Sequence, residues 1–378
     1  MTGLLHTATW GTFYCLVIKP FAVDVPVGDI EDLRTRLGRT RWPSGVSDSG
    51  GFASGDARRL VSYWADSFAW YEQQTRLNQY AQFICSINGL RVHFVHIRSR
   101  HRDALPLLLL HGWPGSFIEF LGVIDRLRDR YDLVVPSLPG FGFSAAPTLA
   151  GMSNRAMADV MAALMTELGY ERFGVHGGDV GAGVATWIAR LHPHRTVGLH
   201  LNYLPGSYVP PSGPELTPEE TEFLRMRSTW FDVHGAYGHL QSTRPLTLSY
   251  GLSDSPVGLV TWIAEKFRDW ADPASRILPD DVLTNVTIYW VTNSIASSMR
   301  VYLESSATPL SFGSGERIST PTAVARFPFE ISSPPRSWVE RVYNVKRWTD
   351  MPRGGHFAAL EAPDLLAGDI AAFFSSFA

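Results

Sequence analysis

Short apolar runs alternate with longer amphipathic segments in the middle of the chain. Residues 105–110, 131–140 and 173–176 are runs such as "LPLLLL", typical of strands that are covered on both faces. Between them, residues 115–130 and 152–169 carry apolar side chains at helical spacing. Alternating strands and helices with short connections predict a mostly parallel sheet covered by helices.

The segment before this region has a different pattern. Residues 29–43 and 56–80 read as helices, because acidic residues precede arginines in the first and aromatic residues recur at helical spacing in the second. Residues 82–99 form two strand-like runs joined by Asn88 and Gly89, a strong signal for a β-hairpin. We therefore expect a helical N-terminal extension that leads into the sheet and packs on the core.

After residue 205 the alternation stops. The following block is mostly helical, with loop-like clusters such as "YVPPSGPELTPEE" and long aromatic helices at 254–270 and 280–306. Strand-like runs return at 321–327 and 341–348, before a last helix at 363–377. The pattern predicts a helical cap inserted into one α/β core. The predicted parts are an N-terminal extension at 1–100, the first part of the core at 101–205, the cap at 206–315, and the second part of the core at 316–378.

One strand-to-helix junction carries the clearest functional signal. The sequence "FGVHGGDVGAGVATWIARLHP" (173–193) reads as a buried strand, a glycine turn and a helix. This is the pattern of the nucleophile elbow of α/β-hydrolases, in which the turn usually presents a serine between small residues. Asp179 occupies that position here, between Gly178 and a following glycine, Gly181. The sequence predicts an α/β-hydrolase core with a carboxylate as nucleophile.

The chain order of such sheets then predicts the partners of Asp179. A histidine is expected after the last strand, where His356 stands in "MPRGGHFAALEAP". An acid is expected after the preceding strand, where Glu330 stands in "RFPFEIS". Asp350 is the alternative acid, but it lies only six residues from His356 and is more easily read as part of the same loop. Placement favours Glu330 and leaves Asp350 open.

The carboxylate nucleophile limits the substrate. A serine that attacked a saturated carbon would form an ether, which water and a histidine do not cleave easily. Asp179 would form an ester instead, and water activated by His356 could hydrolyse that ester. An aspartate at the elbow therefore indicates an alkyl electrophile, either an epoxide or a carbon–halogen bond.

Hydrolysis of that ester places negative charge on an oxygen of Asp179, and this charge needs hydrogen-bond donors. The backbone N–H of Val180 is one candidate, since it follows the nucleophile. The other is the N–H of Trp113 in "HGWPGS" (111–116), which follows an earlier strand. The alternative is that the residues around Trp113 only shape a turn.

An epoxide oxygen also needs a donor as the ring opens, and tyrosine hydroxyls stay neutral at pH 7. The residue pattern alone selects none of the 13 tyrosines. The candidates in or beside the predicted cap are Tyr203, Tyr208, Tyr237, Tyr250, Tyr289 and Tyr302.

Several motifs together resemble those of the microsomal-type epoxide hydrolases: "HGWPGSFIEF", "GGDVG", "DSPVGL", "FPFE" and "RGGHFAALEAP". The similarity runs from about residue 18 to the C-terminus and includes the N-terminal segment "FAVDVPVGDIEDLRTRLGRTRWP". The resemblance implies hydrolysis of an epoxide to a vicinal diol without a cofactor or metal. It implies Asp179 as nucleophile, His356 as base, Glu330 as its orienting acid, and Tyr237 and Tyr302 as the ring-opening tyrosines. Bacterial members of the family that this chain resembles include enzymes of antibiotic biosynthesis, so an intermediate of that kind is one candidate substrate.

Two other functions fit parts of the pattern. A haloalkane or haloacid dehalogenase could use the same aspartate, but haloalkane dehalogenases place a halide-binding tryptophan directly after it, where this chain has Val180. A non-catalytic binding protein with this fold would need an incomplete set of catalytic residues, and the set is complete here.

Composition narrows the remaining choices. The 378 residues are 45% hydrophobic, enough for a large core, and the net charge is −3 without a basic run, so neither nucleic acid nor an anionic membrane is an expected partner. The chain has two cysteines, Cys15 and Cys85, too few for a disulfide framework. It has no apolar stretch of about 18 residues and no membrane anchor, so a cytoplasmic protein is expected. The small-molecule epoxide and water are the expected partners, and a homodimer is left open. Aromatic residues of the cap, Trp230 and Phe231 among them, point to a bulky or aromatic epoxide.

Overall fold

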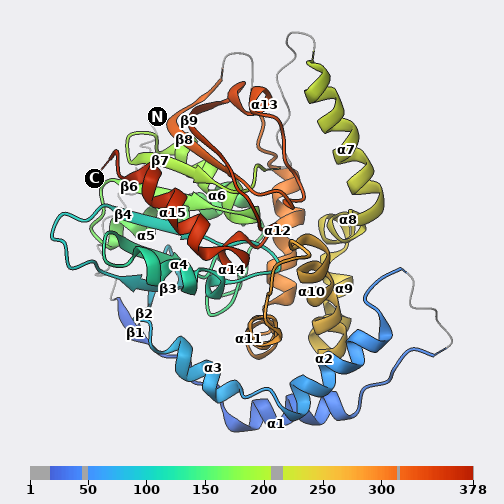
Figure 1. The fold of residues 1–378 in the computed structure, drawn as a ribbon. Helices are drawn as coiled ribbons and strands as arrows, with labels where there is room; N and C mark the ends of the chain where they lie inside the picture. Colours follow the sequence, from blue (N-terminus) through green and yellow to red (C-terminus); the bar gives the residue numbers. More distant parts are fainter. Residues whose placement is uncertain (1–17, 45–49, 206–215, 313–315, 378) are drawn as a thin grey trace, which may run out of the picture.

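A single twisted sheet organises the molecule, with helices on its faces and a helical layer beside it (Figure 1). The computed structural model describes residues 18–44, 50–205, 216–312 and 316–377. Within these residues nine strands pair in the order β1-β2-β3-β5-β4-β6-β7-β8-β9. Their bounds are β1 Lys19–Phe21, β2 Gln82–Ile87, β3 Leu90–Ile97, β4 Pro106–Leu110, β5 Asp132–Pro136, β6 Phe173–Gly177, β7 Thr196–Leu201, β8 Ile318–Arg326 and β9 Tyr343–Asp350.

Strands β4 to β9 run parallel to one another. Strands β1, β2 and β3 pair in antiparallel fashion and extend the sheet at the edge beside β5. The predicted mostly parallel sheet is confirmed. The predicted hairpin is β2 and β3, in which Asn88 and Gly89 have positive φ values of 51° and 81°. Two such residues are what a tight two-residue hairpin turn requires.

Helices of the core pack closely against the sheet because small residues leave room for them. Gly174 and Gly198 are in contact with Phe374 and Phe373, so that a Cβ at either glycine would collide with these rings. A Cβ on Gly181 would collide with the backbone of Leu110, so the first turn of α6 lies directly against β4. The core helices are η1 Phe117–Phe120, α4 Leu121–Leu127, α5 Asn154–Glu167, α6 Asp179–Leu191, α13 Arg336–Glu340, α14 Ala358–Glu361 and α15 Pro363–Phe374.

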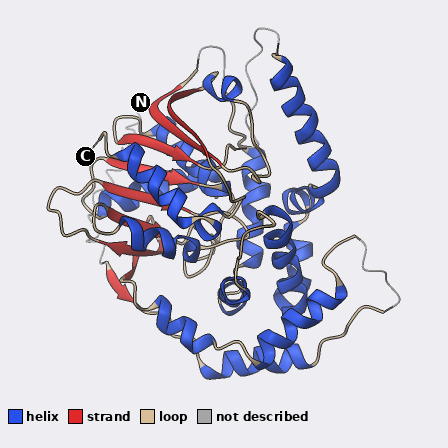
Figure 2. Ribbon diagram, viewed as in Figure 1, coloured by secondary structure: helices blue, strands red, loops and turns tan. Residues whose placement is uncertain are grey.

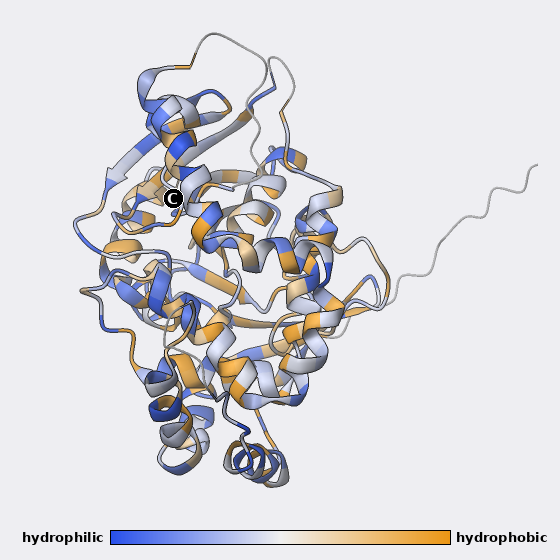
Figure 3. Ribbon diagram, turned by 90° about the vertical axis from the view of Figure 1, so that its right-hand side faces the viewer, coloured by the Kyte–Doolittle hydropathy of each residue, from blue (hydrophilic) through white to orange (hydrophobic). Residues whose placement is uncertain are grey.

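The predicted cap is a layer of helices beside the sheet (Figure 2). We call α7 to α12 the cap helices, and hydrophobic and hydrophilic segments alternate along them in Figure 3, as expected for amphipathic helices. Their bounds are α7 Pro218–His234, α8 Ala236–Thr243, α9 Pro245–Asp254, α10 Pro256–Trp270, α11 Pro279–Val291 and α12 Ile295–Ala307. The cluster "YVPPSGPELTPEE" lies largely outside the described residues.

Hydrogen bonds fix the cap to the loop that follows β4. The side chain of Asn285 donates to the carbonyl of Pro114 at 2.7 Å, and the hydroxyl of Tyr289 donates to the carbonyl of Gly115 at 2.8 Å. Both side chains are on α11 and are buried. This loop is therefore held between the sheet and the cap.

The N-terminal helices follow β1 and run under the cap helices (Figure 1). They are α1 Val27–Gly38, α2 Ser54–Asp66 and α3 Trp70–Leu77. The indole N–H of Trp64 on α2 donates to Thr287 on α11 at 3.0 Å, in a buried contact. Ion pairs of Arg36 with Asp254 and of Arg76 with Asp281 add exposed contacts to the cap. The extension thus extends the sheet through β1 and supports the cap through its helices.

Several predicted helices differ in extent, among them the one expected over 115–130, which is divided into η1 and α4 and ends at Leu127. The helix expected over 29–43 ends at Gly38, and the one expected over 56–80 is divided into α2 and α3. The helix expected over 280–306 is divided into α11 and α12, where Asn293 adopts a φ of 49°. Asparagine tolerates this left-handed conformation, and periodicity alone does not detect such a break.

The described residues include no helix long and apolar enough to cross a lipid bilayer. Cys85 is a buried free thiol, whereas Cys15 lies outside the described residues.

Candidate active site

Asp179 begins helix α6 in a constrained backbone conformation. Its φ is 47°, a left-handed value that is uncommon for a residue other than glycine. The neighbours allow the sharp turn because they are small: a Cβ on Gly177 would collide with the backbone of Gly181, and one on Gly112 would collide with the side chain of Asp179. The junction of β6 and α6 is thus a nucleophile elbow that presents a carboxylate.

The loop after β4 contacts one oxygen of that carboxylate. The backbone N–H of Trp113 donates to Oδ1 of Asp179 at 2.7 Å. The loop is itself fixed by His111, whose Nε2 accepts from the N–H of Leu138 at 3.2 Å. Burial lowers the pKa of His111 to about 4, so the ring is neutral at physiological pH. Residues 111–116 therefore shape a turn and also place the N–H donor of Trp113 beside Asp179. Both roles that the sequence suggested for this motif are present.

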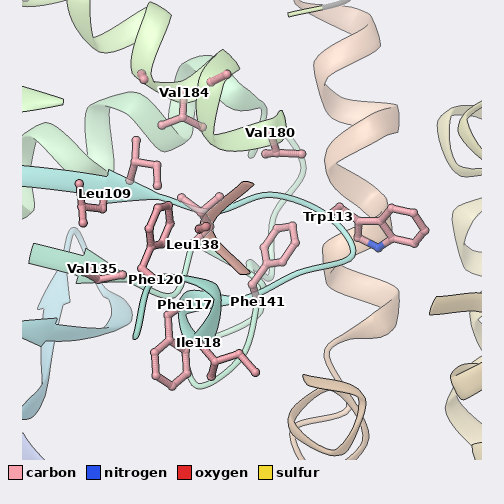
Figure 4. Packing of buried hydrophobic residues seen from close by; sticks show 14 of the residues in the cluster. Leu109, Trp113, Phe117, Ile118, Phe120, Val135, Leu138, Phe141, Val180 and Val184 are labelled. Carbon is pink, nitrogen blue, oxygen red and sulfur yellow. The ribbon is translucent and has the colours of Figure 1, made fainter. Parts of the chain in front are cut away.

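Trp113 also connects the core to the cap. The residues Phe117 and Phe120 of the following η1 pack into the apolar core, while the ring of Trp113 points away toward α12 (Figure 4). There it stacks on Tyr237, with ring centroids 5.5 Å apart, and meets Tyr302 edge-on at 5.8 Å. The backbone of Trp113 thus faces Asp179 while its ring contacts the two tyrosines.

His356 lies between two carboxylates. Its Nδ1 is 2.7 Å from Oε1 of Glu330, and its Nε2 is 3.5 Å from Oδ2 of Asp179. Burial alone would lower the pKa of His356, but the charges of Glu330 and Asp179 and its hydrogen bonds to them raise that pKa well above its usual value. The imidazole is held in an orientation that points Nε2 at the nucleophile.

Buried carboxylates hold the loop that carries His356. Asp272, after α10, accepts from the N–H of Gly354 at 2.9 Å. Glu361, in α14, accepts from the N–H of Phe357 at 2.9 Å and from the N–H of Asp272 at 2.7 Å. Neither acid was identified from the sequence, since nothing in the local pattern distinguishes a loop-bracing carboxylate from a surface one.

Asp350, the alternative partner of His356, is placed elsewhere. It ends β9, pairs with Arg326, and its side chain is 60% exposed. Glu330 by contrast is 2% exposed and also accepts from the N–H of Ile331. The structure thus brings Glu330, and not Asp350, to the imidazole.

Tyr237 on α8 and Tyr302 on α12 meet above Asp179. Their rings meet edge-on with centroids 6.0 Å apart, and each hydroxyl affects the pKa of the other. Burial is the main cause that raises the pKa of each hydroxyl well above 10, and the charge of Asp179 adds to it. Both groups are therefore neutral donors at physiological pH.

The other cap tyrosines are arranged differently. Tyr289 is engaged with Gly115, Tyr250 is 71% exposed, and the ring of Tyr203 lies edge-on to His356 at 5.6 Å. Tyr208 lies outside the described residues.

A cavity of about 790 Å³ opens onto the nucleophile. It is lined by Asp179, Val180, Tyr203, Phe231, Tyr237 and Tyr302, among others. Trp230 does not line it, because its ring packs 6.3 Å from that of Trp270. Phe231 is thus the predicted pocket residue that reaches the cavity, and it is 48% exposed. Among the described residues, no cluster of His, Cys, Asp and Glu side chains could hold a metal ion.

Comparisons with known proteins agree with this geometry. The profile of the family described as epoxide hydrolase N terminus matches residues 18–120, and that of the alpha/beta hydrolase fold matches residues 106–272. Epoxide hydrolase 1 of Oryctolagus cuniculus is 37% identical, over 94% of this chain and 88% of its own. A protein of Stigmatella aurantiaca, provisionally designated an epoxide hydrolase, is 41% identical over 93% of this chain and 84% of its own.

A solved structure shows the same arrangement over nearly the whole length of the chain. The Aspergillus niger epoxide hydrolase superposes with a TM-score of 0.87 at 32% identity, and the match covers 95% of this chain and 96% of that one. The likeness includes the N-terminal extension as well as the core and the cap. The chain therefore belongs to the epoxide hydrolase family and is an epoxide hydrolase with an α/β-hydrolase fold.

Proposed function

We propose that the enzyme works through an ester on Asp179, with the residues of the candidate site in the following roles. Oδ1 of Asp179 is engaged by the N–H of Trp113, so Oδ2 is the oxygen available to attack a ring carbon. As the new C–O bond forms, the ring C–O bond breaks and its electron pair moves to the epoxide oxygen. Tyr237 and Tyr302 hydrogen-bond that oxygen, and one of their hydroxyls supplies the proton.

Formation of the ester changes His356. Esterification removes the negative charge of Asp179, which is one of the causes of the raised pKa of His356. The pKa of the imidazole therefore falls once the ester has formed, and the neutral ring can accept a proton from water. Glu330 keeps Nδ1 as the protonated nitrogen and stabilises the imidazolium that results.

Water then adds to Cγ of the esterified Asp179 while Nε2 of His356 takes its proton. The N–H groups of Trp113 and Val180 stabilise the tetrahedral oxyanion. When the C–O bond between Cγ and the alkyl oxygen breaks, the imidazolium protonates that oxygen. The products are the diol and the carboxylic acid of Asp179, whose proton returns to the tyrosinate left by ring opening, which restores the carboxylate and both tyrosine hydroxyls.

One observation favours an epoxide over a halide: two buried, neutral tyrosine hydroxyls meet beside Asp179. An epoxide oxygen stays attached to the substrate and needs such donors, whereas a halide leaves as an anion. A dehalogenase and a non-catalytic binding protein are therefore not favoured.

The lining of the large cavity supports a bulky or aromatic epoxide as substrate, with Phe231 in contact with it. An intermediate of antibiotic biosynthesis, a cytoplasmic location and a homodimer stay predictions from the sequence.

Trapping the ester tests these roles. In the variant His356→Gln, a chiral aryl epoxide should add its mass to the peptide that contains Asp179, because attack remains possible while hydrolysis does not. Adding Tyr237→Phe and Tyr302→Phe to the same variant should slow formation of this adduct by about 100-fold or more, since the ring oxygen loses its donors. Asp179→Ala is the control that should give no adduct. An adduct on another residue, or none in His356→Gln, would refute the assignment of Asp179.

A further inference from the structure

A second, much smaller cavity lies behind the nucleophile. Its volume is about 20 Å³, enough for one water molecule. Asp179 and His356 line it, together with His111, whose two ring nitrogens are already engaged, and three further polar side chains that have no place in the roles proposed above. These three are Glu119 of η1, His176 of β6 and Asn202 just after β7.

The orientation of His176 is set by a chain of buried groups. Its Nδ1 is 2.9 Å from Nδ1 of His200, and Nε2 of His200 is 3.1 Å from Oδ2 of Asp369. The carboxylate of Asp369 accepts a hydrogen bond from Nε2–H of His200, so the Nδ1 of a neutral His200 is unprotonated. His176 must then donate from Nδ1, which leaves its Nε2 as an acceptor.

That acceptor has no protein partner. Nε2 of His176 is fully buried and makes no hydrogen bond with any described residue, although the ring lines the small cavity. A buried acceptor without a partner costs free energy. A donor inside the cavity would remove this cost.

Glu119 supplies the complementary group. Its carboxyl fills the space beside Gly115, where any side chain would collide with it, and it retains some accessible surface, as a cavity-lining group should. Burial, with a contribution from the charge of Asp179, raises the pKa of Glu119 to about 8, although the charge of His356 opposes this. Glu119 is thus mostly protonated at neutral pH and can donate from its O–H.

We propose that the small cavity binds the water that hydrolyses the ester, and that Glu119 and His176 hold this water for His356. The inference rests on the proposed function, since it needs an ester on Asp179. The water oxygen accepts from the O–H of Glu119, and its two hydrogens point to Nε2 of His176 and Nε2 of His356. Its remaining lone pair faces Cγ of Asp179.

The surroundings of the two histidines decide which one takes the proton. Burial is the main cause that lowers the pKa of His176 well below its usual value, so it accepts a hydrogen bond without becoming a base. His356 has Glu330 beside it and remains the more basic of the two. The proton of the water therefore goes to His356, and His176 serves to orient the molecule.

The O–H of Glu119 gives the proposal a pH signature. Loss of that proton replaces a donor with a negative charge that repels the attacking water oxygen, so ester hydrolysis should slow as the pH rises past the pKa of Glu119. The titratable groups that face or lie near Glu119 are Asp179 of α6, His356 after β9, Glu361 of α14, Tyr289 of α11, His176 of β6 and His111 after β4.

Rapid-quench measurements on the full-length enzyme can separate the two steps. Mass analysis of the peptide that contains Asp179 gives the rate constants of ester formation and ester hydrolysis. Glu119→Leu removes the donor at similar size, and should slow hydrolysis by about 10- to 100-fold while formation changes less than about 3-fold. Glu119→Gln keeps an N–H donor, so its hydrolysis should stay within about 5-fold of the wild type and lose the decline at alkaline pH.

Ile118→Val, a conservative change at the neighbouring residue of η1, is the matched control and should alter neither rate constant. The inference is overturned if Glu119→Leu hydrolyses the ester at the wild-type rate, if both steps slow equally, or if Glu119→Gln retains the alkaline decline. Failure of the proposed function would give a different result, namely that no ester forms on Asp179 in His356→Gln. That result would overturn the inference as well.

Discussion

Two buried histidine–carboxylate pairs, one in the loops after β8 and β9 and one between β7 and α15, differ in their surroundings. His356 and Glu330 are 2.7 Å apart at the active site, and His200 and Asp369 are 3.1 Å apart between β7 and α15. All four side chains are almost fully buried. The distances and burial of the two pairs therefore do not distinguish a catalytic role from a structural one.

The partners of each carboxylate do distinguish them. Asp369 also accepts from Arg347 and Thr349, both at 2.7 Å, so a cation already compensates its charge. Burial alone would raise the pKa of Asp369, but its hydrogen bonds to His200, Arg347 and Thr349 lower that pKa below its usual range. Oε2 of Glu330 has no hydrogen-bond partner among the described residues. Its charge acts mainly on His356, which suits a base.

The largest expected effect, on the rate of ester hydrolysis, comes from removing the charge of Glu330, the carboxylate that pairs with His356. Glu330→Gln should lower the rate of ester hydrolysis by about 1000- to 10,000-fold, because His356 loses both its orientation and the charge that stabilises its protonated form. Single-turnover kinetics with mass detection of the ester measure this directly. A loss of less than 10-fold would mean that Glu330 does not act through His356.

The matched substitution in the pair of His200 and Asp369 should lower the stability of the fold more than it lowers activity. Asp369→Asn leaves Arg347 without its buried partner, and should lower the free energy of unfolding by about 3 kcal/mol. Urea denaturation measures that loss. Activity per folded molecule should fall less than about 10-fold, because Asp369 reaches the water only through His200 and His176. A loss of activity as large as that of Glu330→Gln would show that Asp369, like Glu330, acts in catalysis, and would contradict the structural role of its pair.

The smallest expected effect is a shift in a pH profile. His356 must be neutral to accept a proton, so ester hydrolysis is lost as the pH falls through the pKa of His356 in the esterified enzyme. Esterification removes the charge of Asp179, a cause of the raised pKa, so this acid limb should lie at lower pH than the titration of His356 in the free enzyme. NMR titration of the free enzyme and pH-jump kinetics on the preformed ester give the two values. Identical values would show that Asp179 does not contribute.

The sequence predicted those parts of the site that depend on local pattern and chain order. The glycines around Asp179 mark the elbow, and the order of strands places Glu330 and His356 after it. Chain order does not identify the ring-opening tyrosines. Six candidates occur in or beside the cap, and only the resemblance to a family selected Tyr237 and Tyr302. Helix periodicity does not indicate which face of a cap helix will turn toward the nucleophile.

The small cavity could not be predicted because its residues come from distant segments. Glu119, His176 and Asn202 are polar residues within or beside otherwise apolar elements, and each is compatible with a buried structural role. The hydrogen-bond chain through His200 to Asp369 depends on how β6, β7 and α15 pack together. Trp230 was misplaced for the same reason, since its sequence neighbour Phe231 lines the large cavity instead.

The covalent ester is the central claim, and isotope labelling under single-turnover conditions tests it most directly. The enzyme in excess over an epoxide, in water enriched in oxygen-18, should incorporate the label into one carboxyl oxygen of Asp179 and release an unlabelled diol, because water attacks Cγ rather than the substrate carbon. Mass analysis of the peptide that contains Asp179 and of the diol gives both results. A labelled diol with an unlabelled Asp179 would contradict the account, since it would show that water opens the ring directly.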